Sequence, residues 1–357
     1  VDEVYAIHLR ADYVRGSELD VHQLLQIDAY LYNSKNKAHK TIQELLKQQT
    51  VDLDAILEKL HTCEQMEEVP IKRSQICTRG GKCMYYADCF PEELPDDSIL
   101  NLVQAAHKYA MHQEGITSLQ EADINRIEGT RHQYAQIMAA RNNGLYVDKG
   151  ALRCWKKAHI QEPVSYLDFE WETYAFPPYK GMKPFDVLVF QYSLHVEEHG
   201  QLRHAGYIGE GDCRKEFIEH LLREIPKSGS ILVYNMEGAE KLRLVQLAQQ
   251  FPQYEEQLRA VWERMIDLSL PFSTGNVYDT RMAGYYSLKK LVPIFSDYHY
   301  EDLDISYGMD AVEKWREYCS ADGEKKQELY RQLEQYCSMD TYAEYIVYHA
   351  LEDMIRE

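Results

Sequence analysis

The stretch Tyr166-Leu167-Asp168-Phe169-Glu170 decides the fold of the second half of this 357-residue chain. Residues 164–169 are mostly apolar and are predicted to form a buried strand. Because side chains at positions i and i+2 of a strand point to the same face, Asp168 and Glu170 would present two carboxylates together at the end of this strand. Such close like charges repel unless they are neutralised, and Mg²⁺ and Mn²⁺ favour oxygen ligands. The pair therefore indicates either a divalent-metal site or a solvated acidic strand end.

Further strands and helices are predicted after this stretch. The strands are expected at 187–196, 204–209 and 230–234, and the helices at 212–224, 237–249, 254–265, 287–294 and 325–354. This order predicts an α/β fold, in which helices cover both faces of a mixed sheet.

The first 160 residues are expected to be mainly helical. A strand is predicted at 4–13, helices at 19–46 and 51–60, and mostly helical structure at 96–158, including 119–138 and 145–155. The predicted domains are 1–95, a helical connector at 96–160, and 161–357. Because the chain begins with Val1 and no signal peptide is visible, we expect a fragment of a longer protein.

Composition favours a soluble, cytoplasmic protein without a membrane span. The chain is 45% hydrophobic, and its eight cysteines have no secretory context that would support a disulfide framework. The net charge is −19: residues 1–160 hold 19 Lys and Arg against 23 Asp and Glu (−4), and residues 161–357 hold 20 against 35 (−15). This balance is unusual for a nucleic-acid binder, because phosphate affinity comes largely from Lys and Arg, although bound metal ions or a local basic groove would offset it.

Three cysteines, Cys77, Cys83 and Cys89, follow a C-x5-C-x5-C spacing in a glycine-containing loop. Thiolates suit an iron–sulfur cluster or zinc, and either normally takes four ligands. Cys63 is the nearby candidate for the fourth, and a residue preceding this chain is another. The alternative is three free cysteines in a reducing cell.

Acidic residues on two other predicted elements fit the same site as Asp168 and Glu170. Glu240, with Glu237 close by, lies at the start of the helix after strand 230–234, and Tyr336 and Asp340 lie one turn apart on one face of the last helix. Three or four carboxylates and a tyrosine on separate elements can hold two divalent ions about 3.5–4 Å apart for an in-line displacement at phosphorus.

The order Asp-x-Glu, Tyr-Asn…Glu and Tyr-x-x-x-Asp resembles the DEDD exonucleases of the ribonuclease H-like superfamily. The tyrosine of the last motif resembles their DEDDy branch. The segments LDFE, FQYSLH, ILVYN, SLKKLVP and YCSMDT resemble an uncharacterised bacterial family, in which a RecB-like nuclease domain precedes a DnaQ-like exonuclease domain and the cysteine triplet lies between them. The resemblance covers most of the chain from about residue 70 onward.

This resemblance implies a ribonuclease H-like mixed sheet and a two-metal 3′–5′ exonuclease acting on single-stranded DNA or RNA. Asp168 would bridge two Mg²⁺ or Mn²⁺ ions, Glu170 and Asp340 would complete one ion's site, and Tyr336 would orient the attacking water. The superfamily usually has an aspartate four residues past Asn235, where this sequence has Ala239. Glu240 is therefore the preferred second-motif acid, and Glu237 is its competitor.

The resemblance also implies that residues 1–95 are the C-terminal remnant of a RecB-like nuclease, whose missing N-terminal domain would be a partner. The cysteine triplet would hold a 4Fe–4S cluster or zinc in the full-length parent. The alternative function is a catalytically silent nucleic-acid-binding or scaffolding module attached to such a nuclease, which the −15 charge and the irregular second motif favour. A third hypothesis, a zinc- or cluster-stabilised interaction protein, rests on the cysteines alone.

Other polar residues are expected to have structural roles. His195 is expected to be a hydrogen-bonded core histidine, and Asp267 a capping or turn aspartate. Lys289 and Lys290 would either lie on a solvated face or contact a nucleic-acid backbone.

Overall fold

The computed structural model describes residues 3–31, 37–49, 51–68, 71–79, 81–298, 300, 305 and 308–356. The chain forms two compact units. Unit 1 comprises Val1–Pro91 and Thr173–Asp186, and unit 2 comprises Glu92–Glu172 and Val187–Glu357. The segment expected to be a connector, residues 96–160, therefore belongs to the same compact unit as the sheet that carries Asp168.

Unit 1 begins with a two-stranded antiparallel sheet, in which Ala6 of one strand lies opposite Asp28 of the other. Its elements are β1 (Ala6–Leu9), α1 (Val21–Leu24), β2 (Leu25–Asp28), α2 (Ile42–Gln48), α3 (Leu53–Glu64), the 3₁₀ turn η1 (Gln75–Cys77) and α4 (Tyr86–Cys89). The predicted helix at 19–46 is wrong over residues 25–31 and 37–41. Over residues 25–28 the backbone groups are satisfied by pairing of β2 with β1. Residues 32–36 lie outside the described part.

The segment between β4 and β5 of unit 2 is held by the N-terminal part of unit 1. The backbone N–H of Arg15 donates to the carbonyl of Met182 at 2.9 Å, and the N–H of Gly181 donates to the carbonyl of Arg15 at 2.8 Å. The Arg15 guanidinium also donates to the carbonyl of Pro177 at 2.6 Å. These contacts explain why residues 173–186 cluster with residues 1–91 rather than with the strands that flank them.

A five-stranded mixed sheet forms the centre of unit 2, with strand order β6-β5-β4-β7-β8. Its strands are β4 (Val164–Thr173), β5 (Val187–Glu198), β6 (Gln201–Ile208), β7 (Ser230–Val233) and β8 (Met265–Asp267). β5 and β6 are antiparallel, whereas β7 runs parallel to both β4 and β8. This confirms the predicted α/β fold. Strand β8 was not predicted: the expected helix ends at Trp262, and the next residues pair with β7.

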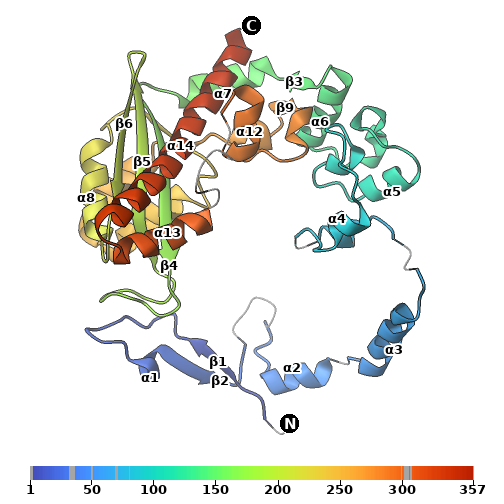
Figure 1. Ribbon diagram of the computed structural model, residues 1–357, viewed down its shortest axis with the longest axis horizontal. Coiled ribbons are helices and arrows are strands. Elements are labelled where there is room, and N and C mark those ends of the chain that lie inside the picture. The colour runs from blue at the N-terminus through green and yellow to red at the C-terminus, as the bar shows by residue number, and fades with distance from the viewer. Residues whose placement is uncertain are drawn as a thin grey trace. The chain divides into compact units, whose positions relative to one another are not determined.

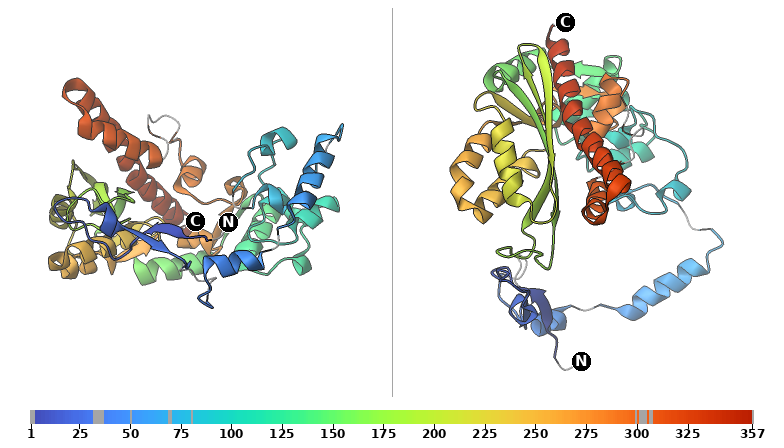
Figure 2. Two further views of the ribbon diagram at one scale, coloured as in Figure 1. Left: turned by 90° about the horizontal axis from the view of Figure 1, so that it is seen from below. Right: turned by 60° about the vertical axis from the view of Figure 1, so that its left-hand side comes forward.

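Side chains alternate between the two faces of β4 and fix which helices cover each face. Leu167 and Phe169 pack into one core with α8 (Arg214–Glu224), α9 (Glu240–Gln250) and α10 (Glu255–Trp262). Tyr166 packs into the opposite core with α7 (Lys149–His159), α12 (Leu288–Phe295) and α14 (Gly323–Arg356). Figures 1 and 2 show α14 along one side of the sheet and α8 along the other. By the same alternation, Asp168 and Glu170 point towards α14.

One long helix of unit 2 was not predicted from the sequence. The helix α13 (Gly308–Ser320) precedes α14 and packs on β5, where Trp315 stacks on Phe190 with ring centroids 4.4 Å apart. The Trp315 indole N–H also donates to the carbonyl of Gly209 at 2.8 Å.

Residues 92–147 add a smaller core to unit 2. Ile99, Leu102, Met111, Leu119 and Ile137 form this core with their neighbours. The elements of this part are α5 (Lys108–Gln113), α6 (Arg131–Arg141) and β3 (Leu145–Val147), with 3₁₀ turns η2 (Ile99–Asn101), η3 (Leu119–Glu121) and η4 (Ile124–Arg126). The predicted helix at 119–138 is wrong before residue 131, where a capping box starts α6.

The small strand β3 connects this part to the C-terminal half. It pairs with β9 (Val277–Asp279), with Tyr146 opposite Tyr278. The predicted helix at 145–155 therefore begins only at Lys149. Short helical segments complete unit 2: η5 (Pro252–Tyr254), α11 (Leu270–Ser273) and η6 (Thr280–Met282).

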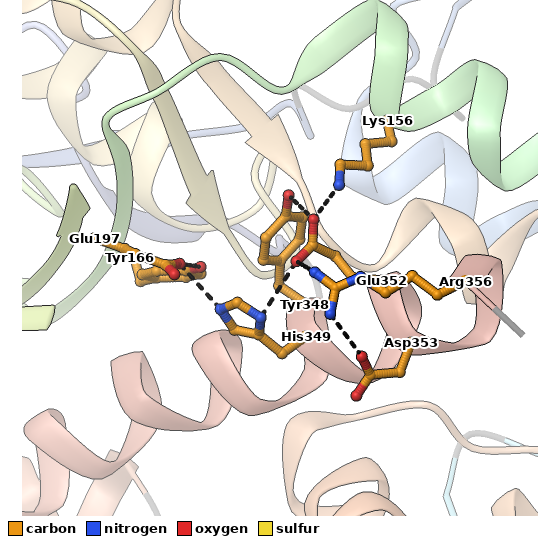
Figure 3. Close-up of polar contacts among 8 residues, drawn as sticks. All are labelled: Lys156, Tyr166, Glu197, Tyr348, His349, Glu352, Asp353 and Arg356. Atoms are coloured by element: carbon orange, nitrogen blue, oxygen red, sulfur yellow. Dashed lines mark hydrogen bonds and ion pairs between the residues drawn. The ribbon is translucent and has the colours of Figure 1, made fainter. Parts of the chain in front are cut away.

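A polar network fixes the C-terminal end of α14 (Figure 3). Glu352 accepts hydrogen bonds from Lys156 of α7 and from the Tyr348 hydroxyl, the latter at 3.0 Å. His349 lies between two carboxylates, with Nε2 3.0 Å from Glu197 at the end of β5 and Nδ1 3.3 Å from Glu352. These contacts hold helix α14 against α7 and β5. They thereby help to position the residues that precede them on the helix.

Candidate metal centre

Two elements bring the predicted acids together. Asp168 and Glu170 point from β4 towards α14, where Tyr336 and Asp340 are separated by one helical turn. One carboxylate oxygen each from Asp168, Glu170 and Asp340 lies within 4.8 Å of the others. Glu170 is 8% exposed, whereas Asp168 and Asp340 are partly accessible. The cluster is thus buried on one side and open on the other.

Glu240 joins this cluster, and Glu237 does not. Glu240 is the first residue of α9, is 2% exposed and lies close enough to Asp168 for the two carboxyl groups to influence each other's pKa. Its Oε2 has no hydrogen-bond partner in the described part of the chain. Glu237 is exposed and pairs with Lys241 at 2.5 Å. The geometry therefore selects Glu240 of the two second-motif candidates.

Two tyrosines surround Asp340. Tyr336 is 4% exposed and lies on the same face of α14, close enough for its hydroxyl to lower the pKa of Asp340 through a hydrogen bond. The Tyr300 hydroxyl donates to Oδ1 of Asp340 at 2.7 Å. Tyr300 was not singled out from the sequence, because it follows a segment without a recognisable motif.

Glu344 is a fifth acid that the sequence analysis missed. It is 1% exposed, and its carboxylate accepts a hydrogen bond from the Leu167 backbone N–H. Its Oε2 finds no partner among the residues that the structure describes. The sequence spacing could have indicated Glu344, because it follows Asp340 by one turn on the same face of the helix.

Mutual repulsion and burial disfavour the ionised form of these acids. Burial raises the pKa of Asp168 and of Glu170 well above the usual range, and the neighbouring carboxylates raise both further. Burial likewise raises the pKa of Glu240 and Glu344. The pKa of Asp340 rises to about 6, because burial outweighs the opposing effects of Tyr300, Lys289 and Tyr336.

A divalent cation fits this arrangement. Oxygen-only ligands at close mutual distance suit Mg²⁺ or Mn²⁺, and a positive ion would offset the repulsion that raises the pKa values. The unpartnered Oε2 of the buried Glu240 is a further acceptor beside Asp168. Asp168, Glu170, Asp340 and Glu240 are therefore the residues that would hold such ions.

Two other polar residues have the structural roles expected from the sequence. His195 is 7% exposed, and its Nδ1 lies 2.8 Å from Oγ1 of Thr341. Asp267 accepts hydrogen bonds from the backbone N–H groups of Asn235, Met236 and Ser269 at 3.2, 3.2 and 2.8 Å. These bonds fix the turn that leads from β7 to Glu240.

The cysteine triplet does not form a comparable site. Cys77, Cys83 and Cys89 are free thiols in unit 1, and Cys83 is exposed. In the described ranges, their sulfur atoms are not gathered into a group of metal-ligating atoms. A metal or cluster at these cysteines stays a prediction from the sequence.

Comparison with known proteins adds one match. A family model described as Domain of unknown function (DUF2779) matches residues 165–287, which run from β4 to the residue before α12. The match includes Asp168, Glu170 and Glu240 and ends before Asp340. No curated protein and no solved structure matches the chain. None of the helices in the described ranges combines the length and apolarity that crossing a membrane requires.

Proposed function

We propose that unit 2 is a metal-dependent exonuclease that removes nucleotides from the 3′ end of single-stranded DNA or RNA by two-metal-ion hydrolysis. The observation that carries this proposal is the convergence of Asp168, Glu170 and Asp340, whose carboxylate oxygens lie within 4.8 Å of one another. The mixed sheet supports it as well, because it is the fold that the resemblance to the ribonuclease H-like DEDD exonucleases implies.

The residues would divide the work according to their positions. Asp168, Glu170, Asp340 and Glu240 would hold Mg²⁺ or Mn²⁺ ions, which supply an activated water and stabilise the leaving 3′ oxygen when bound. The Tyr300 hydroxyl donates to Oδ1 of Asp340 and would orient that carboxylate in the site. Tyr336, beside Asp340, would use its hydroxyl to position the attacking water.

Digestion of end-labelled single strands tests the proposal. DNA and RNA labelled at the 3′ or the 5′ end would be incubated with Mn²⁺, Mg²⁺ or EDTA. We expect stepwise loss from the 3′ end with either metal ion and none with EDTA. Asp168→Asn should reduce the rate by about three orders of magnitude or more, because it would remove one of the carboxylates that hold the ions. The exposed Asp353 at the end of α14 provides a matched control, Asp353→Asn, which should digest normally.

A second pair of variants tests the second-motif acid. Glu240→Gln should lower the digestion rate at least about a hundredfold, because Glu240 lies beside Asp168. Glu237→Gln, in the exposed ion pair with Lys241, should leave the rate unchanged. Equal rates for the two variants would remove Glu240 from the site.

The competing function is a catalytically silent nucleic-acid-binding or scaffolding module. The −15 charge of residues 161–357 and the irregular second motif, with Ala239 where an aspartate is usual, favour this alternative. If the folded chain digests no substrate and does not bind Mn²⁺, the result would support the silent module instead of the exonuclease.

We infer a separate metal site for the cysteine triplet, as part of the RecB-like remnant that the resemblance assigns to residues 1–95. Its support is the C-x5-C-x5-C spacing. Anaerobic purification followed by an absorption spectrum and metal analysis tests it. Broad visible absorption with bound iron indicates a cluster, stoichiometric zinc indicates a zinc site, and neither metal would refute both.

A further inference from the structure

Lys289 is a half-buried cation close to the carboxylate cluster. It is the second residue of α12, whose Leu291 and Val292 are fully or almost fully buried and anchor the helix. Its Nζ lies 5.5 Å from the ring centroid of Tyr300 and 5.7 Å from that of Tyr336. These are the two tyrosines that surround Asp340, so the ammonium group is held by cation–π contacts at the edge of the site.

The charge of Lys289 acts directly on the candidate metal ligands. It lowers the pKa of both Glu170 and Asp340, opposing the increase that burial causes. Of the two neighbouring lysines of α12, Lys289 rather than Lys290 is among the main groups that act on these acids. Lys289 therefore offsets part of the negative charge that a divalent cation would otherwise neutralise alone.

A cation in this position has a different preferred partner once the carboxylates hold metal ions. Positive ions bound by Glu170 and Asp340 would repel the ammonium group and offset its attraction to these carboxylates. An ammonium group on a flexible four-carbon stem can move by a few ångströms and donates up to three hydrogen bonds. In a phosphodiesterase, the anion that binds next to the metal-binding carboxylates is the phosphate to be cleaved.

We propose that Lys289 is a substrate-binding residue, whose ammonium group, beside Tyr300 and Tyr336, contacts a non-bridging oxygen of the scissile phosphate when the metal ions and the strand bind. This inference rests on the proposed function and names its phosphate contact. It predicts two opposite effects of removing the charge: weaker recognition of the phosphate and tighter binding of the metal ion.

The first test measures Mn²⁺ binding to the full chain by calorimetry, without nucleic acid. Lys289→Met should tighten binding about threefold to tenfold, because a competing positive charge near two ligands is removed. Lys290→Met keeps α12 and changes the net charge equally, so it is the matched control and should bind as the wild type. Unchanged or weaker binding by Lys289→Met would overturn the inference.

The second test isolates the phosphate contact. The affinity of the protein for two single-stranded octanucleotides would be measured in Ca²⁺. One has a normal 3′-terminal phosphodiester, and the other has a neutral methylphosphonate at that linkage. The wild type should prefer the phosphodiester by about tenfold or more, as expected for a charge-assisted hydrogen bond, and Lys289→Met should lose this preference. Lys289→Arg should restore part of it, because the positive charge is retained.

The outcomes separate this inference from the proposed function. If Asp168→Asn abolishes digestion but Lys289→Met keeps the phosphodiester preference, the exonuclease stands and the role of Lys289 is refuted. If no variant digests any strand but the wild type shows a preference that depends on Lys289, the contact stands and the hydrolytic function fails. A wild type without any preference refutes the contact.

Discussion

At the residue scale, the most informative feature is an accumulation of buried acids with little compensating charge. Asp168, Glu170, Glu240 and Glu344 each have a pKa raised by burial. Folded proteins seldom bury carboxylates without partners, because an unpaired buried charge is costly. In this protein the cost is concentrated on the face between β4 and α14, which is typical of a functional site rather than of a structural core.

Neutralising one of these acids should stabilise the metal-free protein. Because the folded-state pKa of Glu170 is raised, the ionised carboxylate opposes folding above its unfolded pKa. Glu170→Gln should therefore raise the stability at pH 8 in EDTA by about 1 kcal/mol, a rise of about 2–4 °C in Tm, and abolish stabilisation by Mn²⁺. Thermal unfolding in EDTA and in Mn²⁺ measures both effects. A variant less stable than the wild type in EDTA would contradict this account, and Glu237→Gln serves as the exposed control.

His195 should make the fold sensitive to acid. Burial, together with the neighbouring His204, whose ring centroid is 4.5 Å away, lowers the pKa of His195 to about 4. In the unfolded chain this imidazole binds a proton near pH 6.5, whereas in the folded chain it stays neutral until about pH 4. The free energy of unfolding therefore falls as pH decreases from about 6.5 to 4. The other groups close to this imidazole are the Thr341 hydroxyl and the Tyr342 ring.

Replacing His195 tests this acid sensitivity. His195→Gln can retain a hydrogen bond to Thr341 but does not titrate, so its stability should fall less between pH 6.5 and 4.5, by roughly 2 kcal/mol at the acidic end. Denaturant unfolding at several pH values measures the difference. The exposed His107→Gln is the control, and parallel pH profiles for His195→Gln and the wild type would refute the assignment.

At the element scale, α14 decides the geometry of the site. Its 34 residues carry Tyr336, Asp340 and Glu344 at intervals of one turn, so these side chains lie along one face opposite β4. The polar network around Glu352 fixes the C-terminal part of the helix to α7 and β5 (Figure 3). The alignment of α14 with β4 thus depends on contacts well away from the acids.

Breaking that network should destabilise unit 2. Glu352→Ala leaves Lys156, Tyr348 and His349 without the carboxylate that they share, and should cost about 2–3 kcal/mol. Asp353→Ala, in an exposed ion pair with Arg356 at 3.2 Å, should cost less than about 0.5 kcal/mol. Urea unfolding followed by tryptophan fluorescence compares the two variants. Equal losses would show that the network adds nothing beyond surface pairing.

At the scale of the whole molecule, the division into two compact units separates the site from the N-terminal part. Asp168, Glu170, Glu240 and Asp340 all belong to unit 2, whereas the cysteine triplet belongs to unit 1. The chain passes from unit 2 to unit 1 and back, because residues 173–186 follow β4 but cluster with unit 1.

This division predicts that Mn²⁺ stabilises one part of the chain selectively. Calorimetry should resolve two unfolding transitions, and Mn²⁺ should raise only the transition of unit 2, by about 2.7 kcal/mol at a hundredfold excess over its Kd. Asp168→Asn should remove the shift and leave the other transition unchanged. A single transition that Mn²⁺ moves as a whole would contradict the separation.

Features that follow from local periodicity could be predicted from the amino-acid sequence. Alternation over residues 164–170 placed Asp168 and Glu170 on one face of a strand, and the spacing of Tyr336 and Asp340 placed them on one face of a helix. The α/β class followed from the order of such elements. The short strands β2 and β8 were missed because three or four residues carry no period, and only pairing with β1 and β7 makes them strands.

Which side chains meet depends on the tertiary structure. It selected Glu240 over Glu237, although both lie near the start of one helix, because the turn held by Asp267 directs Glu240 towards Asp168. It also brought Tyr300, Glu344 and Lys289 to the cluster and grouped residues 173–186 with the N-terminal unit. The physical reason is that local periodicity fixes the face on which a side chain lies, whereas its neighbours depend on how distant elements pack.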